Sequence, residues 1–123
     1  MNALKLIFHN SAKALTCTAL LLASPVQAHH GGGHGRPVTA TVYHPWYDGR
    51  TTACGTTYDH WATSAAHPWL PCNTPVKVRY KDRAITVRIK DRCQCDSIDL
   101  SAGAAHKLGV PLDGIATVFI SHP

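Results

Sequence analysis

The sequence predicts a small, mostly β domain with one short helix, and its clearest sign is a β-hairpin. Apolar side chains alternate with basic or polar ones over 76–80 and again over 85–90. The polar turn at 81–83 separates the two runs. Because successive side chains of a strand point to opposite faces, this alternation indicates a strand pair with one buried face. The other face is strongly basic, either as an ordinary solvated surface or as a shallow cationic platform.

Two further strands and one helix complete the expected elements. The β-rich run at 38–43 predicts a first strand. The apolar run at 115–120 predicts a last strand that is buried on both sides. A helix is expected over 101–108, with Ser101 as its N-cap and Gly109 just past its end.

The N-terminus is typical of a secretory signal peptide. Lys5 and Lys13 precede an apolar run at 14–23, and small residues at Val26 and Ala28 predict cleavage after Ala28. The apolar run is too short to serve as a stable membrane anchor. We therefore expect residues 1–28 to be a signal peptide and the rest to be exported, to the periplasm or the extracellular space, without a membrane anchor.

Residues 29–37 are rich in glycine and histidine, which predicts a flexible tail. Its histidines are interpreted either as solvated side chains or as a metal-binding set; they are His29, His30 and His34. Residues 38–123 then form one domain without an internal repeat. For this domain we expect a monomeric state, no cofactor and no metal.

Composition and charge narrow the class of partner. Loss of the two signal-peptide lysines lowers the net charge from +5 to +3. A modest positive balance suits an anionic partner such as a cell-wall polymer or a membrane surface, although solubility alone also explains it. We expect no nucleic-acid partner. The seven acidic residues are all aspartate, so side-chain carboxylate chemistry falls to Asp.

Four cysteines follow the predicted cleavage site, and an even number in an exported chain indicates two disulfides. A zinc site is the competing interpretation, but Cys93 and Cys95 lack the usual two-residue spacer. These two cysteines are too close in sequence to pair without strain. Each is therefore expected to reach back to Cys54 or Cys72.

Two aspartates near the end of the hairpin are candidate functional residues. As a structural residue, Asp91 would accept backbone N–H bonds in a turn and pair with Arg92. As a catalytic residue near a second carboxylate, Asp91 would have a raised pKa and act as a general acid. Asp99 is either an acid that favours the start of the helix or a substrate ligand.

His67 and four aromatic residues also have two interpretations each. His67 is held extended by the following Pro68, with its ring facing either the core or a cleft. Exposed aromatic side chains would stack on sugars, whereas buried ones would fill the core. The four aromatic residues are Tyr43, Trp46, Trp61 and Trp69.

Several short motifs together resemble the RlpA-like (rare lipoprotein A) family. They occur in that family's order from about residue 38 to residue 120, nearly the whole predicted domain. The motifs are Thr-Ala-Cys-Gly at 52–55, Tyr-Asp at 58–59, Ala-Ala-His at 65–67, Leu-Pro-Cys-Asn-Thr at 70–74, Val-Arg-Ile-Lys-Asp-Arg at 87–92, Ile-Asp-Leu-Ser at 98–101, Ala-Ala at 104–105 and Leu-Gly at 108–109.

This resemblance implies a mainly β fold, a six-stranded double-psi β-barrel with one or two short helices, shared with expansins and barwin-like proteins. Characterised RlpA enzymes are peptidoglycan lytic transglycosylases that prefer glycan strands lacking stem peptides. The catalytic aspartate and histidine of that family fall on Asp91 and His67. Its glutamate falls on Thr56, so that acid is missing here.

The same region is similar to bacterial expansins, which loosen wall polymers without hydrolysis. Their threonine and two aspartates match Thr41, Asp91 and Asp99. We therefore expect a substrate-binding set of Thr41, Tyr43, Thr56 and Asp99. In barwin-type proteins the positions of Cys54 and Cys93 look like a disulfide pair, and this resemblance implies a second pair between Cys72 and Cys95.

Two functional hypotheses follow. In the first, the protein is an endolytic lytic transglycosylase in which Asp91 protonates the glycosidic oxygen and then accepts the proton of the muramoyl C6 hydroxyl. In the second, it is a non-catalytic expansin-like or barwin-like module that binds or loosens wall polysaccharide. The presence of Asp91 and His67 favours the first, and the missing glutamate favours the second. In both, the partner is a peptidoglycan glycan strand or a related polysaccharide.

Overall fold

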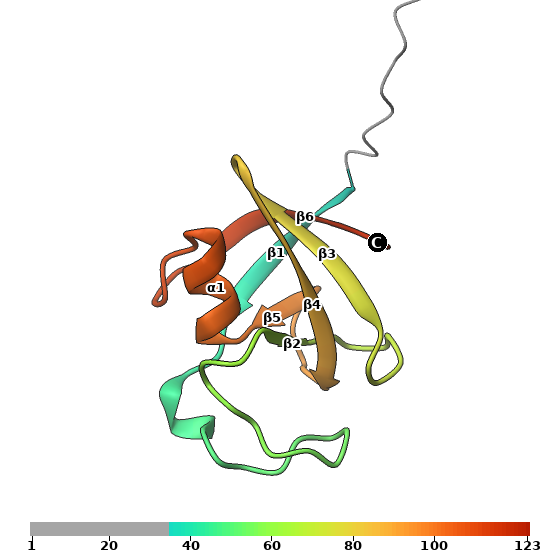
Figure 1. The fold of residues 1–123 in the computed structure, drawn as a ribbon, viewed down its shortest axis with the longest axis vertical. Coiled ribbons are helices and arrows are strands. Elements are labelled where there is room, and N and C mark those ends of the chain that lie inside the picture. Colours follow the sequence, from blue (N-terminus) through green and yellow to red (C-terminus); the bar gives the residue numbers. More distant parts are fainter. Residues whose placement is uncertain (1–34) are drawn as a thin grey trace, which may run out of the picture. The chain divides into compact units, whose positions relative to one another are not determined.

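The computed structural model describes residues 35–123, which form a closed six-stranded β-barrel with one α-helix against its wall (Figure 1). This confirms the predicted fold class. The predicted signal peptide and nearly all of the predicted tail lie outside the described residues. In chain order the elements are β1 (Arg36–Val42), the 3₁₀ turn η1 (Pro45–Tyr47), β2 (Ser64–Ala66), β3 (Pro75–Tyr80), β4 (Arg83–Asp91), β5 (Ile98–Leu100), α1 (Ala102–Leu108) and β6 (Ala116–Ser121).

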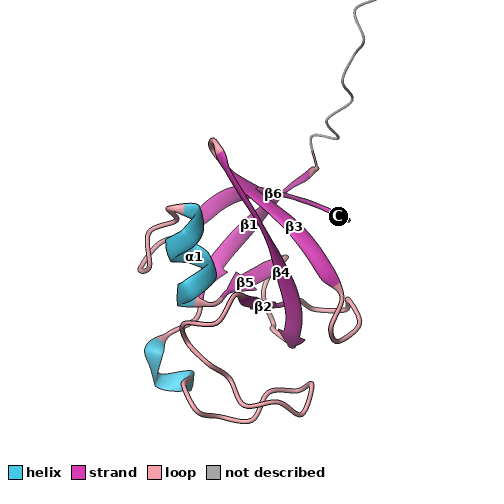
Figure 2. Ribbon diagram, in the orientation of Figure 1, coloured by secondary structure: helices cyan, strands magenta, loops and turns pink. Residues whose placement is uncertain are grey.

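The strand order around the barrel is β1-β5-β2-β4-β3-β6, closing back on β1. Two of the pairings are parallel, β1 with β5 and β2 with β4, and the others are antiparallel. The predicted hairpin is present as β3 and β4, and Figure 2 shows its two long strands crossing the barrel. Long loops gather beyond the ends of β1, β2 and β4 (Figure 2). Loops that are distant in sequence therefore meet at the end of the barrel where the short strands β2 and β5 lie.

Alternation along the hairpin builds the core as the sequence predicts. Val76 and Val78 of β3 and Val87 and Ile89 of β4 are buried, whereas the intervening Lys77 and Arg88 are exposed. The helix adds Ala104, Ala105 and Leu108 to the same apolar cluster. Burial of such aliphatic side chains contributes about 1.5 to 3 kcal/mol each relative to exposure.

The ends of α1 follow from its two capping residues. The fully buried Ser101 hydroxyl accepts the Ala104 N–H at the helix start, as the sequence predicts for an N-cap. It also accepts the Ser64 N–H and donates to the Ala62 carbonyl. Gly109 ends the helix with a φ of 77°, a left-handed conformation that glycine adopts without steric cost.

The last strand is not buried on both sides, which corrects one sequence-based prediction. Ala116 and Val118 of β6 face the core, but Thr117 is exposed and Ile115, just before the strand, is 75% exposed. A barrel wall has one inner and one outer face, and among the described residues no further layer covers the outside of β6. The apolar run at 115–120 therefore reflects β propensity rather than two-sided burial.

The disulfide pairing implied by the resemblance is wrong for this structure. The pairs are Cys54 with Cys72, with Cα atoms 5.8 Å apart, and Cys93 with Cys95. The expectation that the latter two could not pair with each other is also wrong here. The end of β4 explains the first pair, because it holds both loops: Ala53 donates its N–H to the Asp91 carboxylate, and Asn73 donates to the Ile89 carbonyl.

Candidate active site

A groove of about 370 Å³ lies where β4 ends and β5 begins, and both candidate aspartates line it. The two strands are not neighbours in the sheet, but both pair with β2, which lies between them. The lining residues are Tyr43, Tyr47, Asp91, Arg92, Cys93, Gln94, Cys95 and Asp99. We refer to it as the aspartate groove.

Asp91 is held by three hydrogen-bond donors. Its Oδ2 accepts the Tyr43 hydroxyl at 2.7 Å, and its Oδ1 accepts the Ala53 N–H at 2.7 Å and the Arg92 N–H at 2.8 Å. Burial, together with the hydrogen bond to Asp91, raises the pKa of Tyr43 well above its ordinary value, which keeps the phenol protonated as a donor. These three donors fix the orientation of the Asp91 carboxylate. The geometry thus suits Asp91 as a fixed negative charge.

Asp99 has a different environment in the same groove. Parallel pairing of β1 and β5 places Thr41 opposite Asp99, and the Thr41 hydroxyl donates to Asp99 Oδ1 at 2.9 Å. Within the described part of the chain, no hydrogen bond engages Asp99 Oδ2. Burial raises the pKa of Asp99, the Thr41 hydrogen bond lowers it, and the charge of Asp91 raises it, with a net upward shift. Asp99 therefore holds a proton more readily than an ordinary aspartate does.

Tyr43 connects the groove to a small apolar cluster beneath it. Its ring packs on Tyr58, with centroids 4.7 Å apart, and both rings contact the buried Ala66. Tyr47 meets Tyr43 edge to face at 5.5 Å. These contacts fix the phenol that holds Asp91.

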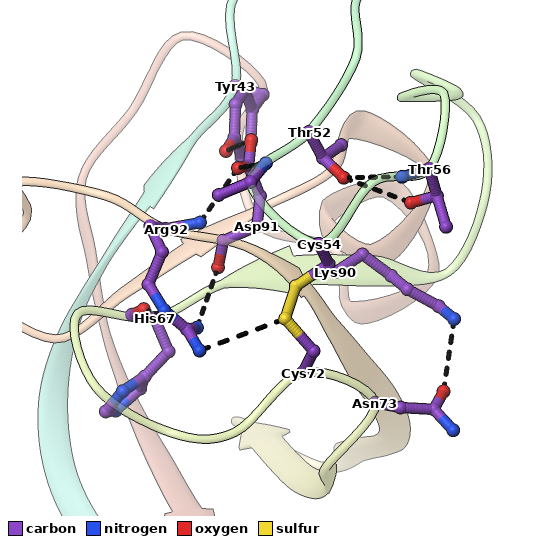
Figure 3. The surroundings of a disulfide bond; sticks show 11 residues. Tyr43, Thr52, Cys54, Thr56, His67, Cys72, Asn73, Lys90, Asp91 and Arg92 are labelled. Atoms are coloured by element: carbon purple, nitrogen blue, oxygen red, sulfur yellow. Dashed lines mark hydrogen bonds between the residues drawn. A yellow bond between two sulfur atoms is a disulfide. The ribbon is translucent and has the colours of Figure 1, made fainter.

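His67 is close to Asp91 in the backbone, yet its ring does not line the aspartate groove. The His67 N–H donates to the Asp91 carbonyl at 3.2 Å, while the ring points away from the Asp91 carboxylate (Figure 3). The ring lines a separate hollow with Arg36, Trp69 and Leu70. Burial, followed by the positive charges of Arg92 and Arg36, lowers the pKa of His67. The expected pair of Asp91 and His67 is thus split between two sites.

Thr56 also lies outside the aspartate groove. Its hydroxyl shares a hydrogen bond with Thr52 at 3.1 Å, and Thr52 lies between Thr56 and Asp91 (Figure 3). It lines a third hollow together with Thr52, Arg88 and Lys90. Of the expected substrate-binding residues, Tyr43 and Asp99 line the groove, and Thr41 contacts it through Asp99.

The groove contains three residues that sequence reasoning did not assign to it, namely Tyr47, Arg92 and Gln94. One of the two interpretations of Asp91 paired it with Arg92. Instead its guanidinium donates to the carbonyls of His67 and Asp91 at 3.3 Å each, and to Cys72 Sγ at 3.9 Å. The sequence offered one signal for Arg92 and Gln94: they lie next to Asp91 and Cys93.

A search of residues 35–123 finds no cluster of three or more potential metal ligands. The histidines of the predicted tail, for which metal binding was left open, lie outside that range. Over the same range no helix is long and apolar enough to cross a membrane.

Comparison with known families bears on this arrangement. A sequence profile of the family described as lytic transglycolase matches residues 39–120. The chain belongs to this family. The matched range contains the whole aspartate groove and all four paired cysteines.

Individual relatives agree with the family assignment. The endolytic peptidoglycan transglycosylase RlpA of Campylobacter jejuni is 40% identical over 84 residues, which cover 64% of this chain and 30% of that protein. The RlpA of Pseudomonas aeruginosa is 41% identical over 85 residues, 65% of this chain and 25% of its own length. This chain thus spans a third or less of these RlpA proteins. An uncharacterized protein of Synechocystis is 40% identical over 85 residues, 68% of this chain and 93% of its own.

One solved structure is similar over almost its full length. The Streptomyces papain inhibitor matches with a TM-score of 0.56 and 31% identity, covering 72% of this chain and 96% of its own. The family fold therefore also occurs in a small protein whose name describes an inhibitor.

Proposed function

We propose that the protein is an exported cell-wall enzyme, an endolytic lytic transglycosylase that cuts peptidoglycan glycan strands lacking stem peptides. The observation that carries the proposal is the pair of unlike aspartates in one groove: Asp91 is held by three hydrogen-bond donors, whereas Asp99 has, among the described residues, one donor, a free Oδ2 and a pKa raised by burial. Family membership and the RlpA relatives support the reaction class. The signal-peptide pattern at 1–28 supports export.

In this proposal Asp99 is the general acid, which revises the role first given to Asp91. The protonated Asp99 donates its proton to the glycosidic oxygen as the bond from that oxygen to the muramoyl C1 breaks. The unengaged Asp99 Oδ2 is the atom available for this transfer. The leaving sugar departs as an alcohol.

Asp91 then stabilises the positive charge that develops at C1. Its carboxylate is already oriented by Tyr43 and two backbone N–H groups, so it needs no reorganisation as the charge forms. The C6 hydroxyl of the same muramoyl residue attacks C1 and gives its proton to the Asp99 carboxylate. The product is a 1,6-anhydromuramoyl end, and Asp99 returns to its protonated form without consuming water.

The test is product analysis on denuded glycan strands by mass spectrometry. Wild-type protein should release 1,6-anhydromuramoyl fragments, and Asp99→Asn should reduce the rate by about 10² to 10⁴, the usual contribution of general acid catalysis. Asp96→Asn is the matched control, since Asp96 is exposed, close in sequence and absent from the groove lining. Absence of anhydro products at high protein concentration would refute the catalytic proposal. A fully active Asp99→Asn would refute the role of Asp99.

A second candidate function is a non-catalytic module that binds or loosens wall polysaccharide. The position that carries glutamate in the RlpA pattern is Thr56 here, and the side chain lies outside the aspartate groove. Binding to insoluble peptidoglycan with no soluble fragment released would favour this function. Because a structurally similar protein is named a papain inhibitor, a papain inhibition assay belongs beside it as a separate control.

A further inference from the structure

The hollow that contains the His67 ring is built unlike the aspartate groove. It measures about 240 Å³ and has an apolar floor of Leu70, Val76 and Ile120. Trp69 forms one wall, with its indole 62% exposed and edge to face against His67 at 4.6 Å. A concave apolar surface with an exposed aromatic ring and a few polar groups is typical of a ligand site. We refer to it as the Trp69 hollow.

The hydrogen-bonding state of His67 follows from its neighbours. Its Nδ1 faces the backbone N–H groups of Trp69 and Leu70, at 3.4 and 3.2 Å. Two donors on Nδ1 require that this atom carries no proton, so a neutral ring has its proton on Nε2. The lowered pKa of His67 agrees with a neutral ring. His67 therefore offers the hollow a donor.

Arg36 brings a positive charge to the hollow. Arg36 of β1 and His122, just after β6, line it, and none of its lining residues is acidic. In the described part of the chain, Arg36 has no carboxylate within ion-pair distance. A ligand with an apolar body, hydrogen-bond acceptors and a negative charge fits this set.

Arg92 connects the aspartate groove to the backbone of His67. It lines the groove, and its guanidinium donates to the carbonyl of His67, whose ring lines the Trp69 hollow (Figure 3). A ligand that bound in both sites would have to be a linear polymer that passes Arg92.

We propose that the Trp69 hollow is a distal glycan subsite, in which a sugar ring stacks on Trp69 and Arg36 binds the free lactyl carboxylate of a muramoyl residue without a stem peptide. The identity of this ligand rests on the proposed function. His67 would then act as a substrate-binding residue at a distance from the reacting bond. A muramoyl carboxylate bearing a stem peptide has no free charge for Arg36, and the peptide would crowd the hollow.

The test is isothermal titration with two hexasaccharides, in the Asp99→Asn background so that no ligand is consumed. One is a stem-peptide-free peptidoglycan hexasaccharide, and the other is chitohexaose, which has the same number of rings and no carboxylate. Trp69→Ala should weaken both ligands about tenfold. Arg36→Gln should weaken only the carboxylate-bearing ligand, about threefold to tenfold. Trp61→Ala removes a similarly exposed indole outside the hollow. It should bind both ligands with the affinity of the parent protein.

A second measurement protects the test from folding artefacts. Long-range ¹H–¹⁵N NMR follows the His67 Nε2 resonance in protein whose Trp69 hollow is unchanged. This resonance should shift on titration with the peptidoglycan hexasaccharide. Parental affinity in Trp69→Ala, equal weakening of both ligands by Arg36→Gln, or an unmoved His67 resonance would each overturn the subsite.

The outcomes separate the subsite from the catalytic proposal. If wild type forms anhydro products but the hollow variants bind both ligands like the parent, the subsite proposal is wrong and the catalytic proposal is supported. If wild type forms no such product but Trp69→Ala and Arg36→Gln weaken binding as expected, the glycan subsite is supported and the catalytic proposal is wrong.

Discussion

The aspartate groove and the Trp69 hollow lie on either side of the end of β2 but differ in chemistry. Ala66, the last residue of β2, packs under Tyr43 at the groove, whereas the ring of the next residue, His67, enters the hollow. The groove holds two carboxyl groups and strong hydrogen bonds. The hollow holds an indole, aliphatic side chains and the Arg36 guanidinium. The comparison teaches that alternation at a strand end can direct the side chains of adjacent residues into two regions of different chemistry.

The largest effect is expected from the disulfide that supports both regions. Cys54 follows Ala53, whose N–H holds Asp91, and Cys72 ends the loop that carries Trp69. Their separation of 18 residues predicts a loss of about 3 kcal/mol in the free energy of unfolding for Cys54→Ala/Cys72→Ala. Denaturant unfolding measures this value. Cys93→Ser/Cys95→Ser is the control and should lose about half as much, because its separation is only 2 residues.

The disulfide prediction also concerns function. Removing the Cys54–Cys72 pair should weaken glycan binding and slow product formation together, because both regions lose their anchor. Unchanged stability, or a defect confined to one region, would show that the two sites are held independently of this bond.

A pH profile should separate the two regions. General acid catalysis by Asp99 requires its protonated form, so kcat should fall as pH rises through the raised pKa of Asp99. Asp91→Asn removes the charge that contributes to this shift, so the alkaline limb should move to lower pH in the residual activity. Trp69→Ala, in the hollow, should not change the pH at which kcat falls. A limb that does not move in Asp91→Asn would contradict the assignment of the acid.

The smallest effect is expected at Thr56, which lines neither region. Restoring the acid of the RlpA pattern with Thr56→Glu should change product formation by less than about threefold, since the side chain is exposed and absent from the groove lining. Thr57→Glu, on the neighbouring exposed residue, is the matched control. A large gain of activity in Thr56→Glu alone would mean that this loop closes over the groove when substrate binds.

Much of the fold was predictable because its long elements carry strong local signals. Alternation identified β3 and β4, and the Ser101 and Gly109 caps bounded α1 within one residue. The strands β2 and β5 have three residues each, which is too short for a periodic pattern, and only the family resemblance implied a six-stranded barrel. Their registers place Thr41, Ala66 and Asp99 side by side, so the groove depended on information absent from local sequence.

The site was predictable in part for the same reason. Asp91, Asp99 and Tyr43 were identified, but their different environments depend on which backbone N–H groups and hydroxyls the fold brings to them. A register shift between Ala65 and Ala66 comes just before His67, and no composition pattern reveals it. The disulfide pairing depends on the loops that meet at the end of β4, and analogy with barwin-type proteins misplaced it.

The buried Ser101 hydroxyl has a consequence for how this end of the barrel opens. One oxygen accepts the N–H groups of Ser64 and Ala104 and donates to the Ala62 carbonyl. The first turn of α1 and the start of β2 therefore lose protection against solvent together when this oxygen is displaced. Hydrogen exchange at the two amides should be correlated, with one opening free energy for both. Strand β2 and helix α1 would thus open as one cooperative unit.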